Sequence, residues 1–154
     1  MTPKEVSLVQ ESFESVKPIS EAAADLFYTR LFELDPALKA LFRTDRAEQG
    51  RKLMQALAFV VKGLSRPEQI VPVVEDLGRR HVSYGVRDEH YGTVGQALLW
   101  TLEKGLGEAF TSEVREAWTS AYTLLATVMQ KAAAQVSVIG QARATDARAA
   151  EARV

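Results

Sequence analysis

The sequence contains no cysteine, and only two of its 154 residues are histidine. Disulfide bonds, thiolate nucleophiles and cysteine zinc sites are therefore excluded. The two histidines, His81 and His90, are too few for a metal cage built from several imidazoles of one chain. These absences leave few of the side chains that usually carry redox or metal chemistry.

An excess of positive charge is also lacking, since 19 basic and 20 acidic side chains give a net charge of −1. The basic footprint that nucleic-acid binding requires is therefore missing at the level of the whole chain. No apolar signal segment opens the sequence, and no hydrophobic run approaches the length of a membrane span. We expect a cytoplasmic protein with neither a nucleic-acid nor a membrane partner.

The composition and the spacing of apolar residues predict one all-α domain. Hydrophobic residues make up 47% of the chain and charged residues 25%, which is ordinary for a domain that buries a core. Apolar residues recur at helical spacing, and the alternation typical of strands is absent. The expected helices cover about 3–17, 20–34, 36–42, 49–64, 72–84, 88–106 and a last one from 112, with a polar corner over 43–48. Thr2 and Glu5 predict a capping box at the first helix, and Asp88 could cap the helix that ends at 106. We place the domain at 1–135, followed by an Ala/Arg-rich tail at 136–154 that is either poorly ordered or a helix extension.

The expected helix over 72–84 carries the most informative residue, His81. Pro72 can open this helix and Gly85 can close it. Its apolar stripe consists of Val74, Leu77, His81 and Tyr84. An inward imidazole suits an iron ligand in a flat apolar cofactor, but it is also typical of a core histidine that bonds a backbone carbonyl. The spacing alone leaves both interpretations open.

Two more polar residues, Tyr28 and Gln49, lie on apolar faces, where burial without a partner is costly. Each has a simple alternative, because Tyr28 can bond a backbone carbonyl and Gln49 can face solvent in a first helical turn. Together with His81 they would form a pocket for a metal-bound diatomic ligand. We interpret His90, in the first turn after Asp88, as a surface residue, because the helix dipole disfavours a cation there.

Several motifs match a known family over about residues 4–132. They are Leu41-Phe42, Gln49-Gly-Arg-Lys-Leu-Met54, Leu77-Gly-Arg-Arg-His81, His90-Tyr91 and Glu116-Ala-Trp118. In these motifs and in the order of its helices the chain resembles the globins, most of all the single-domain bacterial haemoglobins and the globin half of flavohaemoglobins. It is also similar to neuroglobin. The resemblance implies a three-over-three sandwich of about seven to eight helices around haem b (iron protoporphyrin IX).

The resemblance also implies a role for each matching residue. His81 matches the proximal iron ligand, Phe42 the phenylalanine stacked on the porphyrin, and Tyr28 the distal tyrosine. Gln49 falls at the distal position, where an amide cannot ligate iron as an imidazole does. The other haem contacts that the resemblance implies are Lys52, Leu53, Arg80, Val86, Tyr91 and Val94, with Leu53 also on the distal side.

The function that the resemblance implies is reversible binding of dioxygen, and of CO and NO, at ferrous iron. Hydrogen bonds from Tyr28 and Gln49 would slow the release of dioxygen. No residue is assigned as catalytic, and we expect a monomer or a weak homodimer. A helical interaction protein without a cofactor is a further interpretation, and it predicts a colourless protein.

Nitric oxide dioxygenation is the enzymatic alternative. Flavohaemoglobins carry a flavin reductase after the globin part, whereas this sequence ends at Val154, so the expected electron donor is a separate reductase. In that family a glutamate of the last helix joins the proximal histidine and a tyrosine in a hydrogen-bonded set. Tyr91 matches the tyrosine, but the glutamate position aligns on Ala133, which weakens the expected electron push toward dioxygen.

Overall fold

The computed structural model describes residues 1–42 and 45–146, with side chains as far as Val136. Within these residues all regular secondary structure is helical, which confirms the all-α prediction. The described helices are α1 (Pro3–Val16), η1 (Lys17–Ile19), α2 (Ser20–Leu34), η2 (Pro36–Leu41), α3 (Arg46–Gly63), α4 (Pro67–Ser83), α5 (Asp88–Leu106), η3 (Gly107–Ala109) and α6 (Ser112–Asp146). The described α-helices are slightly fewer than expected, because the segment after Asp35 winds as the 3-10 helix η2.

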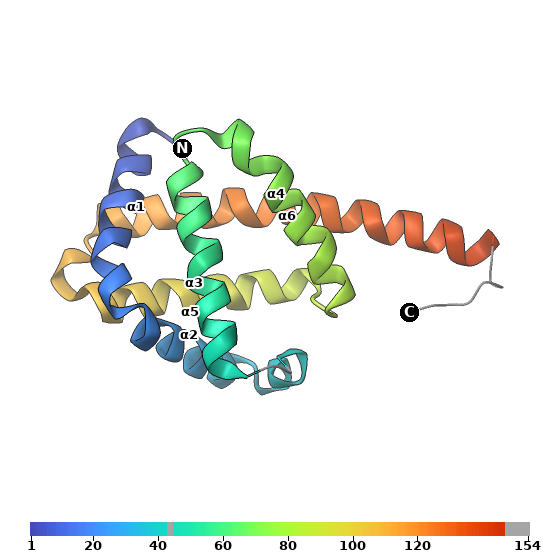
Figure 1. The fold of residues 1–154 in the computed structure, drawn as a ribbon, viewed down its shortest axis with the longest axis horizontal. Coiled ribbons are helices and arrows are strands. Elements are labelled where there is room, and N and C mark those ends of the chain that lie inside the picture. The colour runs from blue at the N-terminus through green and yellow to red at the C-terminus, as the bar shows by residue number, and fades with distance from the viewer. Residues whose placement is uncertain (43–44, 147–154) are drawn as a thin grey trace.

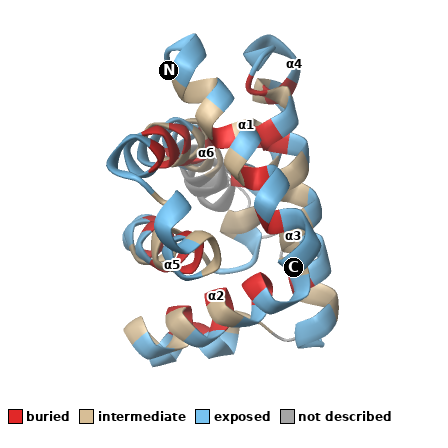
Figure 2. Cartoon of the chain, turned by 90° about the vertical axis from the view of Figure 1, so that its left-hand side faces the viewer, coloured by how far each residue is buried: buried red, intermediate tan, exposed pale blue. Residues whose placement is uncertain are grey.

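The helices form two crossed layers. In Figure 1, α1, α3 and α4 run across α5 and α6, and the side view in Figure 2 separates α1, α3 and α4 from α5 and α6, with α2 below. α1 and α4 pack mainly on α6, and α2 packs mainly on α5. This is the three-over-three arrangement expected from the sequence, with α2, α5 and α6 forming the second layer.

The core lies where the two layers face each other, as the red segments in Figure 2 indicate. Large side chains from four helices meet there, namely Phe13, Phe27, Leu31, Leu98 and Trp118. The Trp118 indole N–H donates to the Ser12 hydroxyl at 2.8 Å, so the polar atom of this buried ring is satisfied. The core therefore ties α1 to α6 and gives the site a rigid support.

Local cap chemistry decides where the helices begin. At α1 the predicted capping box is present, with the Glu5 N–H on the Thr2 hydroxyl and the Thr2 N–H on the Glu5 carboxylate. α3 begins at Arg46, three residues before the predicted start, because Asp45 accepts the Glu48 N–H and caps it.

The start of the helix that carries His81 was predicted wrongly. α4 begins at Pro67, and Pro72 lies inside it. Proline suits a first helical turn because it has no N–H to satisfy, and Pro67 takes that place. Pro72 removes one hydrogen bond further along, on an exposed side of the helix where water can solvate the freed carbonyl.

The predicted end of the same helix is confirmed at Gly85. This glycine has a φ of 91°, a conformation that costs other residues energy and that turns the chain out of α4. Tyr84 was wrongly placed on the buried stripe, because it caps the helix and is 55% exposed. The helix ends at Ser83, so the helical spacing that places Val74, Leu77 and His81 on one face no longer applies to Tyr84.

Gly78 lets α4 approach α6 closely. A Cβ at this position would lie 2.7 Å from Met129 Cα, a main-chain atom that cannot move aside without separating the helices. We expect Gly78→Ala to lower the free energy of unfolding by about 1–3 kcal/mol, as overpacking usually does. Chemical denaturation of the purified protein measures the change.

Gly92→Ala in α5 is the matched control, because nothing lies within 4 Å of a Cβ built there. Alanine favours a helix interior over glycine by up to about 1 kcal/mol. The control should therefore be neutral or stabilising. Equal stability of both variants would contradict the close approach of α4 to α6.

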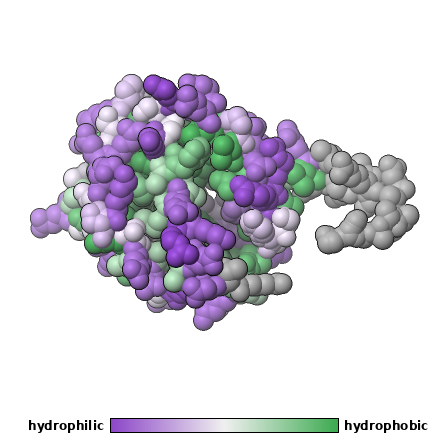
Figure 3. All heavy atoms as spheres, viewed as in Figure 1, coloured by the Kyte–Doolittle hydropathy of each residue, from purple (hydrophilic) through white to green (hydrophobic). Residues whose placement is uncertain are grey.

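The surface is mixed rather than divided into a polar and an apolar side. Figure 3 shows hydrophilic residues over much of one face, with apolar residues between them. None of the helices in the described part of the chain combines the length and the apolar character needed to cross a bilayer. α6 continues to Asp146, so it includes the first part of the expected tail, whereas residues 147–154 lie outside the described residues.

Candidate functional site

His81 occupies the last turn of α4, and hydrogen bonding to the backbone fixes its ring. Nδ1 lies 2.6 Å from the Leu77 carbonyl oxygen, one turn earlier, which confirms the carbonyl bond considered from the sequence. Nδ1 therefore carries the proton that it donates, and Nε2 keeps its lone pair. Burial lowers the pKa of His81, aided by the nearby Arg80 cation and opposed by the Leu77 bond. The lowered pKa favours a neutral ring, the Leu77 bond favours the proton on Nδ1, and Nε2 has no hydrogen bond to a described residue.

The chain after His81 folds back beside it. The His81 carbonyl accepts the Tyr84 N–H at 3.1 Å and the Val86 N–H at 3.0 Å. Val86 is half-buried and packs against the hydrophobic core. The turn at Gly85 therefore brings an apolar contact residue back toward the end of α4.

His90 was wrongly interpreted as a surface residue, because it is only 8% exposed. Its Nδ1 accepts the Arg87 N–H at 2.9 Å, so the imidazole caps the start of α5. Asp88, which the sequence suggested as the cap, is the first residue of the helix instead. A neutral imidazole acts as an acceptor, and the unfavourable interaction of a cation with the helix dipole does not arise.

Tyr122, a half-buried tyrosine of α6, holds the beginning of α5. The Tyr122 hydroxyl donates to the Tyr91 carbonyl at 2.6 Å, and a Cβ on Gly95 would lie 2.8 Å from the Tyr122 ring. Tyr91 is buried and Val94 is half-buried, both in contact with the core. α6 therefore fixes the part of α5 that carries two of the predicted haem contacts.

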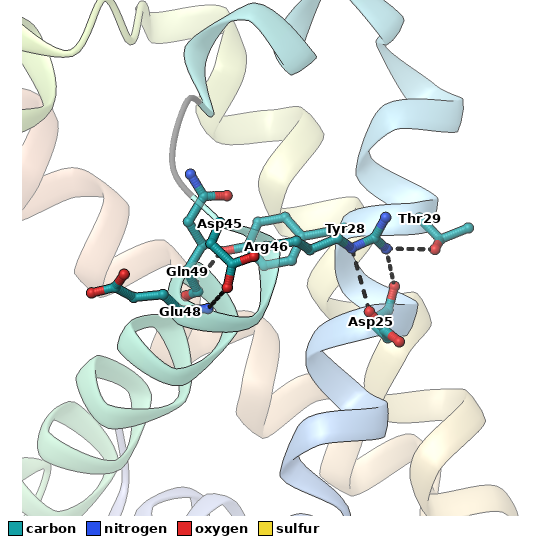
Figure 4. A network of polar contacts seen from close by, with 7 residues as sticks. All are labelled: Asp25, Tyr28, Thr29, Asp45, Arg46, Glu48 and Gln49. Atoms are coloured by element: carbon teal, nitrogen blue, oxygen red, sulfur yellow. Dashed lines mark hydrogen bonds and ion pairs between the residues drawn. The ribbon is translucent and has the colours of Figure 1, made fainter.

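Tyr28 and Gln49 are brought together from α2 and α3 (Figure 4). The Tyr28 hydroxyl donates to the Gln49 main-chain carbonyl at 3.3 Å, which is a long and weak hydrogen bond. Burial raises the pKa of Tyr28 to about 12, while the Arg46 cation acts in the opposite direction, so the phenol stays protonated near neutral pH. The Gln49 side chain is half-buried, points away from its own carbonyl in Figure 4, and makes no hydrogen bond to a described residue.

Phe42 joins Tyr28 in an aromatic cluster. Its ring centroid lies 5.4 Å from that of Tyr28 and 5.5 Å from that of Phe32, both in edge-to-face contacts. Phe42 itself is only half-buried, and Leu53 in the second turn of α3 is half-buried as well. The residues predicted to contact a cofactor thus combine core packing with a partly open face.

The two predicted cations lie on the exterior and do not meet each other. Lys52 Nζ lies 3.9 Å from Glu48, and Arg80 Nε lies 3.1 Å from Asp76. More than half of each cationic side chain is exposed, so these pairs add little stability and exchange partners easily. Both cations remain accessible to an anionic group at the surface.

The protein offers one histidine as a metal ligand, which suits a metal ion that is already held by a cofactor. No three His, Asp or Glu side chains gather into a metal-binding group in the described ranges. A bare transition-metal ion needs about four ligands, and one imidazole cannot hold it. One imidazole with a free Nε2 would be enough for the iron of a haem, which brings its other nitrogen ligands with it.

Sequence reasoning missed one residue of this region, Arg46. It lies in a segment expected to be an irregular polar corner, yet it is the first residue of α3 and reaches to α2. The signal that could have found it is Asp45, whose carboxylate begins a helix three residues before the predicted start.

Comparison with known families matches residues 25–129 of the chain to the Globin model. The chain is 36% identical to the flavohemoprotein of Bordetella parapertussis over 153 residues, which cover 97% of this chain and 36% of that protein. It is 29% identical to the neuroglobin of Danio rerio, over 85% of this chain and 91% of that one. The chain thus spans about a third of the length of the flavohemoproteins it matches.

Solved structures show the same arrangement of helices. An engineered carbene transferase from Rhodothermus marinus, provisionally described as a nitric oxide dioxygenase, superposes with a TM-score of 0.82 at 26% identity, covering 90% of this chain and 97% of that one. A bacterial globin from Campylobacter jejuni has a TM-score of 0.79 at 23% identity, covering 88% and 99%. At this identity, the similarity to the Campylobacter jejuni globin supports the fold alone.

Proposed function

The chain belongs to the globin family, and from this premise we propose that it binds haem b through His81 and takes up dioxygen, CO and NO reversibly. Haem bound there would supply a ferrous iron able to bind a diatomic ligand. The observation that carries the proposal is the short Nδ1 bond from His81 to the Leu77 carbonyl. It leaves Nε2 as a neutral donor of fixed direction.

The surrounding side chains would hold the flat cofactor and exclude water. Phe42 offers an aromatic ring, and the cations of Lys52 and Arg80 are placed to pair with carboxylates at the cofactor edge. The apolar walls would come from Leu53, Val86, Tyr91 and Val94. Low water content in the pocket strengthens each polar contact made to a ligand.

Tyr28 and Gln49 would stabilise a diatomic ligand that carries partial negative charge. The Tyr28 hydroxyl gives up only a 3.3 Å bond when it turns from the Gln49 carbonyl to the ligand. The Gln49 amide has no bond to a described residue to give up. A hydrogen bond to a charged acceptor contributes about 1.5–3 kcal/mol, so dioxygen release should be slow and CO release less affected.

The visible absorption spectrum of the purified protein tests the proposal. We expect a pigmented protein with a five-coordinate ferrous spectrum that changes to six-coordinate on addition of CO. A colourless protein that stays colourless after incubation with haem would support a helical protein without a cofactor. A six-coordinate ferrous spectrum without any added ligand would contradict an open ligand position.

Similarity to flavohemoproteins favours a second function, nitric oxide dioxygenation with a separate reductase. One observation weighs against efficient turnover. The Tyr91 hydroxyl has no hydrogen bond to a described residue, and Ala133 offers it no carboxylate. The hydrogen-bonded set that would strengthen electron donation toward dioxygen is therefore not formed by these two residues. Nitrate formed in excess of one equivalent per haem, with NO, dioxygen and a flavin reductase supplied, would separate this enzyme from a dioxygen carrier.

A further inference from the structure

Arg46 links the first turn of α3 to α2 beside Tyr28 and Gln49 (Figure 4). Its Nη2 donates to the Asp25 carbonyl and to the Thr29 hydroxyl, each at 2.8 Å. Its Nε approaches the Asp25 carboxylate at 3.3 Å. The planar guanidinium therefore uses three of its N–H groups on α2, in one fixed orientation.

The position of this contact relates it to both ligand donors. Asp25 and Thr29 lie on either side of Tyr28 in α2, and Gln49 follows Arg46 by three residues, about one helical turn. The Arg46 guanidinium carbon also lies 5.9 Å from the centre of the Tyr28 ring. A single side chain thus touches the helix of one donor and begins the helix of the other.

Arg46 makes shorter hydrogen bonds between α3 and α2 than the two donor residues make with each other. The Tyr28 hydroxyl bond to the Gln49 carbonyl is 3.3 Å long. One turn of α3 beyond Arg46, a Cβ on Gly50 would lie 2.9 Å from the Ala24 Cβ, so the two helices approach closely there. The two 2.8 Å Arg46 hydrogen bonds tie the first turn of α3 to α2 beside this close approach.

We propose that Arg46 is a positioning residue of the distal pocket, which sets where the Tyr28 hydroxyl meets a diatomic ligand. This inference rests on the proposed function. Arg46 does not itself contact the ligand and acts through Tyr28. The ion pair with Asp25 is largely exposed and contributes little by itself. The bonds to the Asp25 carbonyl and the Thr29 hydroxyl carry the effect.

The test compares Arg46→Ala and Thr29→Val with the wild type. The infrared stretching frequency of CO in the ferrous CO complex reports hydrogen-bond donors beside the ligand, since a donor lowers this frequency. We expect Arg46→Ala to shift the band toward that of Tyr28→Phe and to speed dioxygen dissociation roughly two- to tenfold. Thr29→Val, which removes one acceptor and keeps the side-chain shape, should give a smaller change in the same direction.

Arg51→Ala is the matched control, because it removes the same charge from an exposed position of the same helix. It should leave the CO band and the dissociation rate at wild-type values. The double variant Arg46→Ala, Tyr28→Phe should equal Tyr28→Phe alone, because a residue that acts through Tyr28 has no effect without the hydroxyl. Additive effects of the two substitutions would overturn the inference.

Amide hydrogen exchange gives a readout that does not depend on ligand binding. In the wild-type protein the amide N–H groups of Glu48 and Gln49 donate to Asp45. These amides should exchange faster in Arg46→Ala than in Arg51→Ala. A colourless protein overturns the proposed function and this inference with it. A pigmented protein whose CO band responds to Tyr28→Phe, but not to Arg46→Ala, overturns this inference alone.

Discussion

Replacing His81 by glycine should abolish the five-coordinate haem spectrum and lower haem affinity by at least roughly 100-fold. His90 is the only other histidine of the chain, so it is the only possible substitute imidazole. The His90 ring is nearly buried, and its Nδ1 is committed to the Arg87 N–H at the start of α5. Haem titration of the apoprotein, followed by absorption, measures the loss.

Added imidazole should restore the pigment in His81→Gly, because a free ring can occupy the space of the missing side chain. His90→Gln is the matched control: it costs about 1 kcal/mol of stability through the lost cap but keeps the five-coordinate spectrum. An unaltered five-coordinate spectrum in His81→Gly would contradict the assignment of His81 as the iron ligand.

Features that depend on local backbone chemistry were predictable from the sequence. The Thr2 capping box and the left-handed Gly85 follow from side-chain type alone, and both are confirmed. The start of α4 was not, because Pro67 and Pro72 are both compatible with a first turn. The residues between the two prolines pack as part of the helix, with Ile70 buried in the core, and the helix therefore begins at Pro67.

The direction of polar side chains in the site was less predictable than the faces they lie on. Periodicity places Tyr28 and His81 on inward faces, and the structure agrees that Tyr28 is buried and His81 is half-buried. Periodicity alone does not tell whether the Tyr28 hydroxyl bonds a main-chain carbonyl. The structure shows that it does. His90 shows the same limit, since its role depends on which ring nitrogen carries the proton.

Tyr28→Phe should speed dioxygen dissociation by roughly 10- to 100-fold, the loss expected for one hydrogen bond to a partly charged ligand. The fold should be nearly unaffected, since the hydroxyl makes only a 3.3 Å bond to the Gln49 carbonyl. Stopped-flow displacement of dioxygen by CO measures the rate. CO dissociation, which depends less on hydrogen bonding, should change by a smaller factor.

Tyr122→Phe is the matched control for Tyr28→Phe, because it also removes a phenolic hydroxyl that donates to a main-chain carbonyl, here that of Tyr91 at 2.6 Å. It should cost about 1 kcal/mol of stability and leave the dissociation rate within about twofold. If Tyr28→Phe released dioxygen at the wild-type rate while Gln49→Leu accelerated it, the amide would be the donor. Because burial raises the pKa of Tyr28 to about 12, the wild-type rate should also stay constant between about pH 7 and pH 10. A rise in the rate over that interval would mean that the phenol loses its proton there, and the buried position of Tyr28 argues against this.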